Sequence, residues 1–244
     1  MSRFVIRGGK PVSGVHRAPG NKNAALPMLA ASLLTAEPVT LSNLPLISDV
    51  RTMLDLLSDI GADVALDAET RTVRIHARKV KTVHLSKALC GKVRSSILFA
   101  GPLLARCGAA KLYPPGGDVI GRRRIDTHLD GFRQLGAAVK ANGVYAFKAG
   151  KGLAAQRILL DEASVTATEN LIMAAALAKG TTVLYNSACE PHVQDLCRMI
   201  NAMGGKIAGI GTNRLSVEGV AELRGTEQRI GPDYIDAGSY LAAA

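Results

Sequence analysis

The sequence predicts an α/β fold built from three repeated helix-strand units. Three stretches with the same pattern begin at Ala25, Ser95 and Ala167, and a fourth begins at Ile235. The interval between them is about 70 residues, a period that is typical of one supersecondary unit used several times. Each stretch has an Ala/Leu-rich segment, a short apolar segment, a segment with helical apolar spacing and a Gly-Ala or Gly-Gly stop. Such units bury their apolar faces against one another.

In the first unit, the Ala/Leu-rich residues from Ala25 predict a helix that ends in a turn at Glu37. The alternating residues 38–43 predict a strand, and residues 62–77 predict two more strands joined by a polar turn. Between them, apolar residues at helical spacing predict an amphipathic helix, with a stripe of Val50, Met53, Leu54, Leu57 and Ile60. The order of the unit is therefore helix, strand, helix, strand, strand.

The second and third units repeat this order. Gly108 and Gly180 stand at the turn after the first helix, and residues 109–115 and 181–187 predict the strands that follow. The second amphipathic helix has a stripe of Ile125, Leu129, Phe132 and Leu135. We expect the units to pack around a common centre with strands on one side and helices on the other.

The composition is that of a globular protein. The chain has 244 residues, of which 48% are hydrophobic, and its longest apolar stretches, 97–105 and 171–178, are too short to span a membrane. The first residues lack the apolar core of a secretory signal. The four cysteines form no CxxC pair and have no histidines at zinc-ligand spacing, which argues against disulfides and a structural metal. We therefore expect a cytoplasmic protein in which Cys107 and Cys197 are core residues.

The net charge of +10 predicts anionic partners. These could be nucleic acid, or small molecules that carry phosphate or carboxylate groups. The basic residues are scattered along the chain, only 4% of the residues are aromatic, and there is no tryptophan to stack on bases. The pattern favours small anionic molecules over nucleic acid.

The segment 19–27, PGNKNAALP, places Lys22 between two asparagines at the start of a predicted helix. Backbone N–H groups at a helix N-terminus and an ammonium group together can bind an anion. The same residues also suit an ordinary helix start that is capped by asparagine. Spacing alone leaves both interpretations open.

The segment 114–126, PPGGDVIGRRRID, is a long glycine-rich loop with one aspartate, Asp118, followed by three arginines. Arginines pair with phosphate or carboxylate oxygens in a bidentate manner, and a carboxyl on a mobile loop is a candidate general acid. The alternative is a long turn with a solvated basic face. Loops of this length in compact domains are usually functional.

Three weaker signals accompany these motifs. Arg94 lies just before an apolar helix, where a cation is misplaced for the helix dipole unless an anion binds there. The Ser/Thr-rich residues 161–170 could hold a polar ligand or simply cap a helix. Of the histidines, His128 could face the same site as Arg124. The others are expected to be surface or edge residues without partners: His16, His76, His84 and His192.

Together these motifs resemble the enolpyruvyl transferase family, in its UDP-N-acetylglucosamine 1-carboxyvinyltransferase branch. The resemblance is carried by KNAALP at 22–27, VRSSILFAGPLLAR at 93–106, PGGDVIGRRRIDTH at 115–128, ATENLIMAAALAKGTT at 167–182 and PDYIDAGSYLAAA at 232–244. The related 5-enolpyruvylshikimate-3-phosphate synthases share the fold, but KNAALP is typical of the UDP-sugar branch.

The resemblance implies an inside-out α/β barrel, in which each of two similar domains is a threefold repeat and the active site lies between them. It implies that residues 21–230 form one complete domain. Residues 1–20 would be strands of a second domain that is largely missing, and residues 231–244 would begin that domain's next repeat. The base for the sugar hydroxyl and further arginines would lie beyond Ala244.

The implied reaction transfers the enolpyruvyl group of phosphoenolpyruvate to the 3′-hydroxyl of UDP-N-acetylglucosamine and releases phosphate, as the first committed step of peptidoglycan synthesis. It needs no metal or organic cofactor. The alternative is a non-catalytic truncated fragment that folds and at most binds the UDP-sugar weakly.

Position by position, the resemblance implies catalytic roles for Lys22 and Asp118 and substrate contacts for Lys22, Asn23, Arg94, Arg123, Arg124, Ile125, Asp126 and Thr127. Glu162, Ala163, Ser164 and Val165 would line the uridine pocket. Two positions depart from the family pattern. Asp118 stands where most members have the cysteine that fosfomycin alkylates, and Glu162 stands where a lysine is often found.

Overall fold

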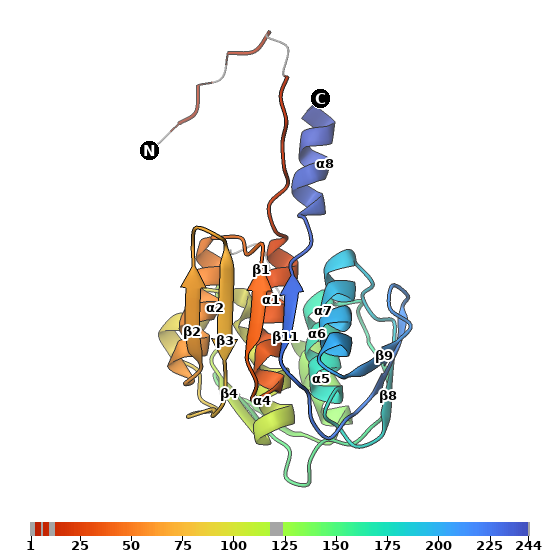
Figure 1. Ribbon diagram of the computed structural model, residues 1–244. Coiled ribbons are helices and arrows are strands. Elements are labelled where there is room, and N and C mark those ends of the chain that lie inside the picture. The colour runs from red at the N-terminus through yellow and green to blue at the C-terminus, as the bar shows by residue number, and fades with distance from the viewer. Residues whose placement is uncertain (1–2, 6, 10–12, 118–123, 244) are drawn as a thin grey trace.

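The computed structural model describes residues 3–5, 7–9, 13–117 and 124–243. Of the predicted site residues, Asp118 and Arg123 lie outside this part of the chain. Figure 1 shows the repeated units as one body, from which α8 and the N-terminal segment project together.

The first unit has the predicted order of helix, strand, helix, strand, strand. Its elements are α1 (Lys22–Ala31) with the short 3-10 helix η1 (Ser32–Leu34), β1 (Val39–Ser42), α2 (Ser48–Asp59), β2 (Asp63–Asp67) and β3 (Thr72–His76). The whole stripe predicted along α2 is buried, from Val50 to Ile60. The prediction for this unit is confirmed. It was possible because burial periodicity can be recognised within short segments.

The second unit differs from the prediction in its first helix, which is divided into a 3-10 and an α-helical part. The α-helical part begins at Ala100, so Pro102 lies in its first turn, where the N–H that proline lacks would have no partner within the helix. The elements are α3 (Lys87–Cys90), η2 (Arg94–Phe99), α4 (Ala100–Cys107), β4 (Ala109–Leu112), α5 (Asp126–Gln134), β5 (Ala138–Ala141) and β6 (Tyr145–Lys148).

The third unit again follows the prediction, and a short strand precedes it. Its elements are β7 (Arg157–Leu159), α6 (Val165–Ala175), β8 (Thr181–Tyr185), α7 (Pro191–Ala202), β9 (Lys206–Ala208) and β10 (Arg214–Glu218). The chain continues into β11 (Thr226–Arg229) and α8 (Tyr234–Ala243).

The described strands form three sheets, with the orders β11-β1-β3-β2, β4-β6-β5 and β7-β8-β10-β9. In each sheet the strand after the first helix pairs antiparallel with a strand of the following hairpin. A parallel partner is added on the other side: β11 beside β1 and β7 beside β8, while His84 forms only an isolated bridge with Lys111 of β4. Because β11 comes from the end of the third unit, its pairing with β1 joins the last unit to the first.

The first helix of each unit lies in the interior. Ala24 to Ala31 of α1, Ala100 to Leu104 of α4 and Ala167 to Ala175 of α6 are all buried. Helices that are apolar on every side belong in a core. In Figure 1 the sheet that contains β1 and β11 covers α1 from outside. The arrangement is the inside-out one, with helices at the centre and sheets around them, rather than one layer of strands against one layer of helices.

One buried asparagine of α6 links the second and third units by hydrogen bonds. The Asn170 side chain accepts a hydrogen bond from the Gly101 N–H at 2.8 Å and donates one to the Ile97 carbonyl at 2.8 Å. Its amide nitrogen also lies 3.0 Å from Nδ1 of His128. A Cβ on Gly101 would stand 2.4 Å from the Asn170 carbonyl oxygen, so only glycine allows this approach.

Residues 19–21 and 231–233 run side by side where the chain enters and leaves the three units. The Asn21 N–H bonds the Gly231 carbonyl and the Asp233 N–H bonds the Pro19 carbonyl, each at 2.8 Å. Beyond this point α8 has no buried residue, and Val15 and Leu241 are exposed. The described residues before Gly20 contain no strand. The assignment of residues 1–20 and 231–244 to a second domain stays a prediction.

The predictions for Cys107, His192 and His16 were wrong. Cys197 is buried as expected, but Cys107 is exposed because it ends α4, just before the left-handed Gly108. His192 is buried, and its Nδ1 lies 3.3 Å from the Tyr234 hydroxyl. His16 lies 2.6 Å from a carboxylate oxygen of Asp236. Both histidines have partners that are more than 40 residues away in the chain, a distance at which periodicity carries no signal.

Candidate functional site

Two cavities adjoin at Arg94, which lines both. The smaller has a volume of about 260 Å³ and the larger about 640 Å³. The smaller lies between residues of all three units: Asn23, Leu26, Pro27, Arg94, Ser95, Leu98, Val165, Thr166, Glu169 and His192. The larger is lined by Arg94, Pro114, Pro115, Arg124, Ile125, Asp126 and Tyr145. Of the residues predicted to contact substrate, Arg94 lines both cavities and five more line one of them.

The start of α1 positions Lys22 and Asn23. Asn21 caps the helix, since its side-chain oxygen accepts hydrogen bonds from the N–H groups of Asn23 at 2.7 Å and Ala24 at 3.3 Å. The capped start is thus confirmed. Lys22 forms an ion pair with Asp49 at 3.2 Å and remains partly exposed, while Asn23 lines the smaller cavity. Anion binding here stays a prediction. It is supported by the ammonium group of Lys22 beside the helix N-terminus, a combination suited to anions.

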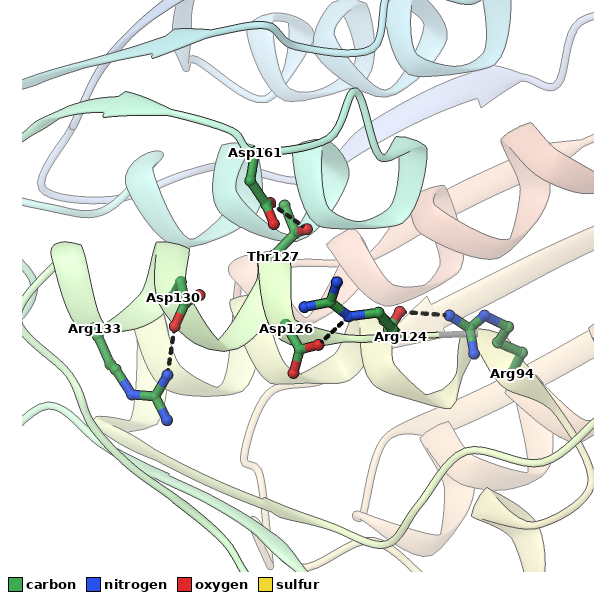
Figure 2. Close-up of polar contacts among 7 residues, drawn as sticks. All are labelled: Arg94, Arg124, Asp126, Thr127, Asp130, Arg133 and Asp161. Carbon is green, nitrogen blue, oxygen red and sulfur yellow. Dashed lines mark hydrogen bonds and ion pairs between the residues drawn. The ribbon is translucent and has the colours of Figure 1, made fainter. Parts of the chain in front are cut away.

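A chain of polar contacts connects the cavities to α5 (Figure 2). Arg94 donates a hydrogen bond through Nη2 to the Arg124 carbonyl at 3.0 Å, and Arg124 pairs through Nε with Asp126 at 2.5 Å. The hydrogen bond to Asp126 raises the pKa of Arg124. Both partners of this ion pair are exposed, so a bound anion can reach the arginine.

The segment before α6 is held to α5 by Thr127, whose hydroxyl donates to Asp161 at 2.6 Å (Figure 2). Ser164 caps α6 by accepting a hydrogen bond from the Ala167 N–H at 3.4 Å. Val165 lines the smaller cavity, while Glu162 and Ala163 are exposed and line neither of the two. The capping interpretation of this segment is confirmed, and its contact with a nucleotide stays a prediction.

His128 does not face the cavities, so the expectation that it shares a site with Arg124 was wrong. The side chain is 1% exposed, with Nε2 3.0 Å from the Thr166 hydroxyl and Nδ1 3.0 Å from the Asn170 amide. The Asn170 amide nitrogen donates to Nδ1, so the ring proton is on Nε2 and is donated to Thr166. Burial lowers the pKa of His128 to about 3, with a further contribution from the charge of Arg94. His128 is a neutral structural residue.

The sequence predictions missed Glu169 and His192 at the smaller cavity. Glu169 is four residues after Val165 on α6, so the two side chains share one helix face. That spacing is the signal that could have found Glu169. His192 comes from the first turn of α7, and only the packing of α7 against α1 brings it to the cavity.

A family profile described as EPSP synthase (3-phosphoshikimate 1-carboxyvinyltransferase) matches residues 6–244. The chain belongs to this EPSP synthase family. The resemblance to enolpyruvyl transferases is thereby confirmed. Among the described residues, no helix is long and apolar enough to cross a membrane.

Relatives within the EPSP synthase family carry a more specific name. The chain is 53% identical over 244 residues to a UDP-N-acetylglucosamine 1-carboxyvinyltransferase of Treponema denticola, and 51% identical over 244 residues to one of Treponema pallidum. In both cases the match covers 100% of this chain and 57% of the relative. The chain therefore spans little more than half the length of these curated relatives.

Solved structures of the same family share the fold. The enolpyruvyl transferase NikO from Streptomyces tendae matches with a TM-score of 0.83 at 23% identity, over 98% of this chain and 56% of that one. EPSP synthase from Acinetobacter baumannii matches with a TM-score of 0.77 at 20% identity. The predicted α/β barrel of repeated helix-strand units is confirmed.

Proposed function

We propose that this chain forms one side of the active site of an enzyme that transfers the enolpyruvyl group from phosphoenolpyruvate to the 3′-hydroxyl of UDP-N-acetylglucosamine. The observation that carries the proposal is the 53% identity to a UDP-N-acetylglucosamine 1-carboxyvinyltransferase over the whole chain. The two cavities that adjoin at Arg94 support it, because residues expected to bind substrate line both.

The reaction proceeds by addition and elimination. The sugar oxygen forms a bond to C2 of phosphoenolpyruvate and loses its proton to a base, while an acid protonates C3. The tetrahedral intermediate then expels phosphate, and loss of a proton from C3 restores the double bond. In this proposal Asp118 is the acid, and Lys22, Arg123 and Arg124 stabilise the phosphate and carboxylate charges.

The proposal extends to the role of the protein in the cell. The product would enter peptidoglycan synthesis, so the protein would act in the cytoplasm and support cell wall formation, cell shape and cell division. Its partners would be the two small substrates rather than nucleic acid, and no cofactor would be required. With aspartate instead of cysteine at position 118, alkylation by fosfomycin would be lost.

A second candidate is a binding fragment without turnover, which is favoured by the 57% coverage of the relatives. Measuring phosphate release from phosphoenolpyruvate by the 244-residue chain, with and without UDP-N-acetylglucosamine, separates the two. We expect release that depends on the sugar nucleotide if the chain completes the site by itself or by self-association. Binding of the sugar nucleotide without any release would instead support the binding fragment.

Arg94 allows a test of the site itself. We expect Arg94→Leu to weaken binding of UDP-N-acetylglucosamine by about tenfold or more, because charge-assisted hydrogen bonds contribute about 1.5–3 kcal/mol. Titration calorimetry at fixed ionic strength measures this. The matched control is Arg133→Leu, which removes an exposed arginine of α5 that pairs with Asp130 and lines neither cavity (Figure 2). Equal affinities of the two variants would contradict the proposed site.

A further inference from the structure

The smaller cavity contains a buried carboxyl group whose hydrogen bonds are incomplete. Glu169 is 1% exposed, and its Oε1 has no hydrogen-bond partner among the described residues. A buried polar atom without a partner costs about 1–3 kcal/mol. Native structures contain few such atoms, and those that occur call for a specific reason. Because Glu169 lines a cavity, a ligand bound there would supply the missing hydrogen-bond partner.

Burial and the neighbouring charged groups together influence the protonation of this carboxyl. Burial raises the pKa of Glu169 well above its usual value, and the charge of Glu190 raises it further. From α7, burial lowers the pKa of His192 and raises that of Cys197 to about 12, so both are neutral near pH 7. From η2, Arg94 reaches the same cavity. The raised pKa favours the protonated form of Glu169, which offers both an O–H donor and a carbonyl acceptor.

The two cavities differ in character on either side of Arg94. The larger is lined by the exposed Arg124 and Asp126, whereas the smaller has apolar walls of Leu26, Pro27, Leu98 and Val165 with a few polar groups. A sugar nucleotide has a diphosphate at its centre, and an arginine is the preferred partner of such a group. With the diphosphate at Arg94, the nucleoside suits the larger cavity and the sugar the smaller one.

We propose that Glu169 is a substrate-binding residue whose carboxyl forms a hydrogen bond with a hydroxyl or acetamido group of the bound sugar. This inference rests on the proposed function and extends it, because it assigns the sugar to the smaller cavity. The uncharged carboxyl provides hydrogen bonding without repelling the nearby phosphates. This hydrogen bond would make the site specific for the sugar, because a ligand that lacks the sugar leaves the Glu169 carboxyl without a partner.

The test compares UDP-N-acetylglucosamine with UDP, using calorimetry on the 244-residue chain. We expect Glu169→Leu to weaken UDP-N-acetylglucosamine binding by about tenfold and to change UDP binding by less than about twofold. Glu169→Gln, which keeps a donor and an acceptor, should stay within about threefold of the unaltered chain for both ligands. The tenfold loss corresponds to one hydrogen bond of about 1.4 kcal/mol.

The matched control is Thr182→Val. Thr182 lies on β8, away from the cavities, is fully buried, and its hydroxyl also has no partner among the described residues. This change should leave the affinities for both ligands unaltered. If Glu169→Leu binds UDP-N-acetylglucosamine as tightly as the unaltered chain, the inference about Glu169 is overturned and the proposed function stands. If the unaltered chain binds neither ligand, the proposed function falls and the inference falls with it.

A second measurement does not depend on the folding of the leucine variant. Infrared difference spectra should contain a band from the protonated Glu169 carboxyl that disappears in Glu169→Gln. We expect this band to shift when UDP-N-acetylglucosamine is added and to stay in place when UDP is added. A band that does not respond to the sugar nucleotide, although calorimetry shows binding, would assign Glu169 a purely structural role.

Discussion

Replacing Asn170 with leucine is expected to lower the free energy of unfolding by about 3 kcal/mol, with the fold retained. The change removes the partner of the Gly101 N–H, the Ile97 carbonyl and Nδ1 of His128 at once. All three belong to buried segments, and each unsatisfied group costs about 1–3 kcal/mol. Leucine offsets part of this loss, because it is the better helix former and buries apolar surface.

Urea unfolding followed by circular dichroism measures the effect of Asn170→Leu. The matched control is Asn142→Leu in the exposed turn between β5 and β6, for which we expect a change within about 0.5 kcal/mol. If Asn170→Leu loses no more stability than this control, water or local rearrangement satisfies the three groups. Asn170 would then contribute little to holding the second and third units together.

The second large effect is a loss of stability in acid caused by His128. The pKa of His128 is about 3 in the folded protein, against about 6.5 in the unfolded chain. Between these values the unfolded state binds more protons, so the free energy of unfolding decreases as the pH falls from 6.5 towards 3. The slope approaches about 1.4 kcal/mol per pH unit, and the total is about 4 kcal/mol.

Two other buried groups also make the stability depend on pH. Burial lowers the pKa of His192, which adds to the loss in acid. Glu169 acts in the opposite direction: its pKa is raised, so its contribution to stability is present at low pH and is lost as the pH rises above about 4.5. The effect of His128 must therefore be isolated by comparing variants.

His128→Gln keeps a donor and an acceptor but cannot take up a proton. We expect the unfolding free energy of this variant to depend less steeply on pH between 6.5 and 4 than that of the unaltered chain. His84→Gln, at an exposed position, is the control that should leave the slope unchanged. Identical slopes for His128→Gln and the unaltered chain would mean that the pKa of His128 is the same in the folded and the unfolded chain.

The order of elements could be predicted because it depends on patterns within short segments. The stripe from Val50 to Ile60 and the alternation in 62–77 each report burial on a single element, whatever packs against it. Gly108 directly follows α4 and Gly180 directly precedes β8, with positive φ angles of 70° and 95°, a conformation that glycine adopts readily. The Asn21 cap is local in the same sense, since its partners lie two and three residues away.

The strands β7 and β11 were not predicted. They have three and four residues, and their partners β8 and β1 belong to other segments of the chain. Alternation over so few residues is too short to recognise. The same limit explains His16 and His192, whose partners are far away in sequence, and Cys107, whose exposure depends on its position at the end of α4.

For the site, the sequence determined which segments carry charged and flexible residues, and its motifs identified the family. The repeated pattern by itself determined the three units and their elements, because secondary structure follows from local propensity and burial period. The inside-out arrangement was implied by the family motifs but not by the repeat pattern, which suggested strands on one side and helices on the other. The positions of Arg94 between two cavities and of His128 in the core became visible only in the folded chain. The tertiary structure also brought Glu169 and His192 together with Asn23. These outcomes depend on contacts between distant residues, for which a single sequence carries no periodic signal.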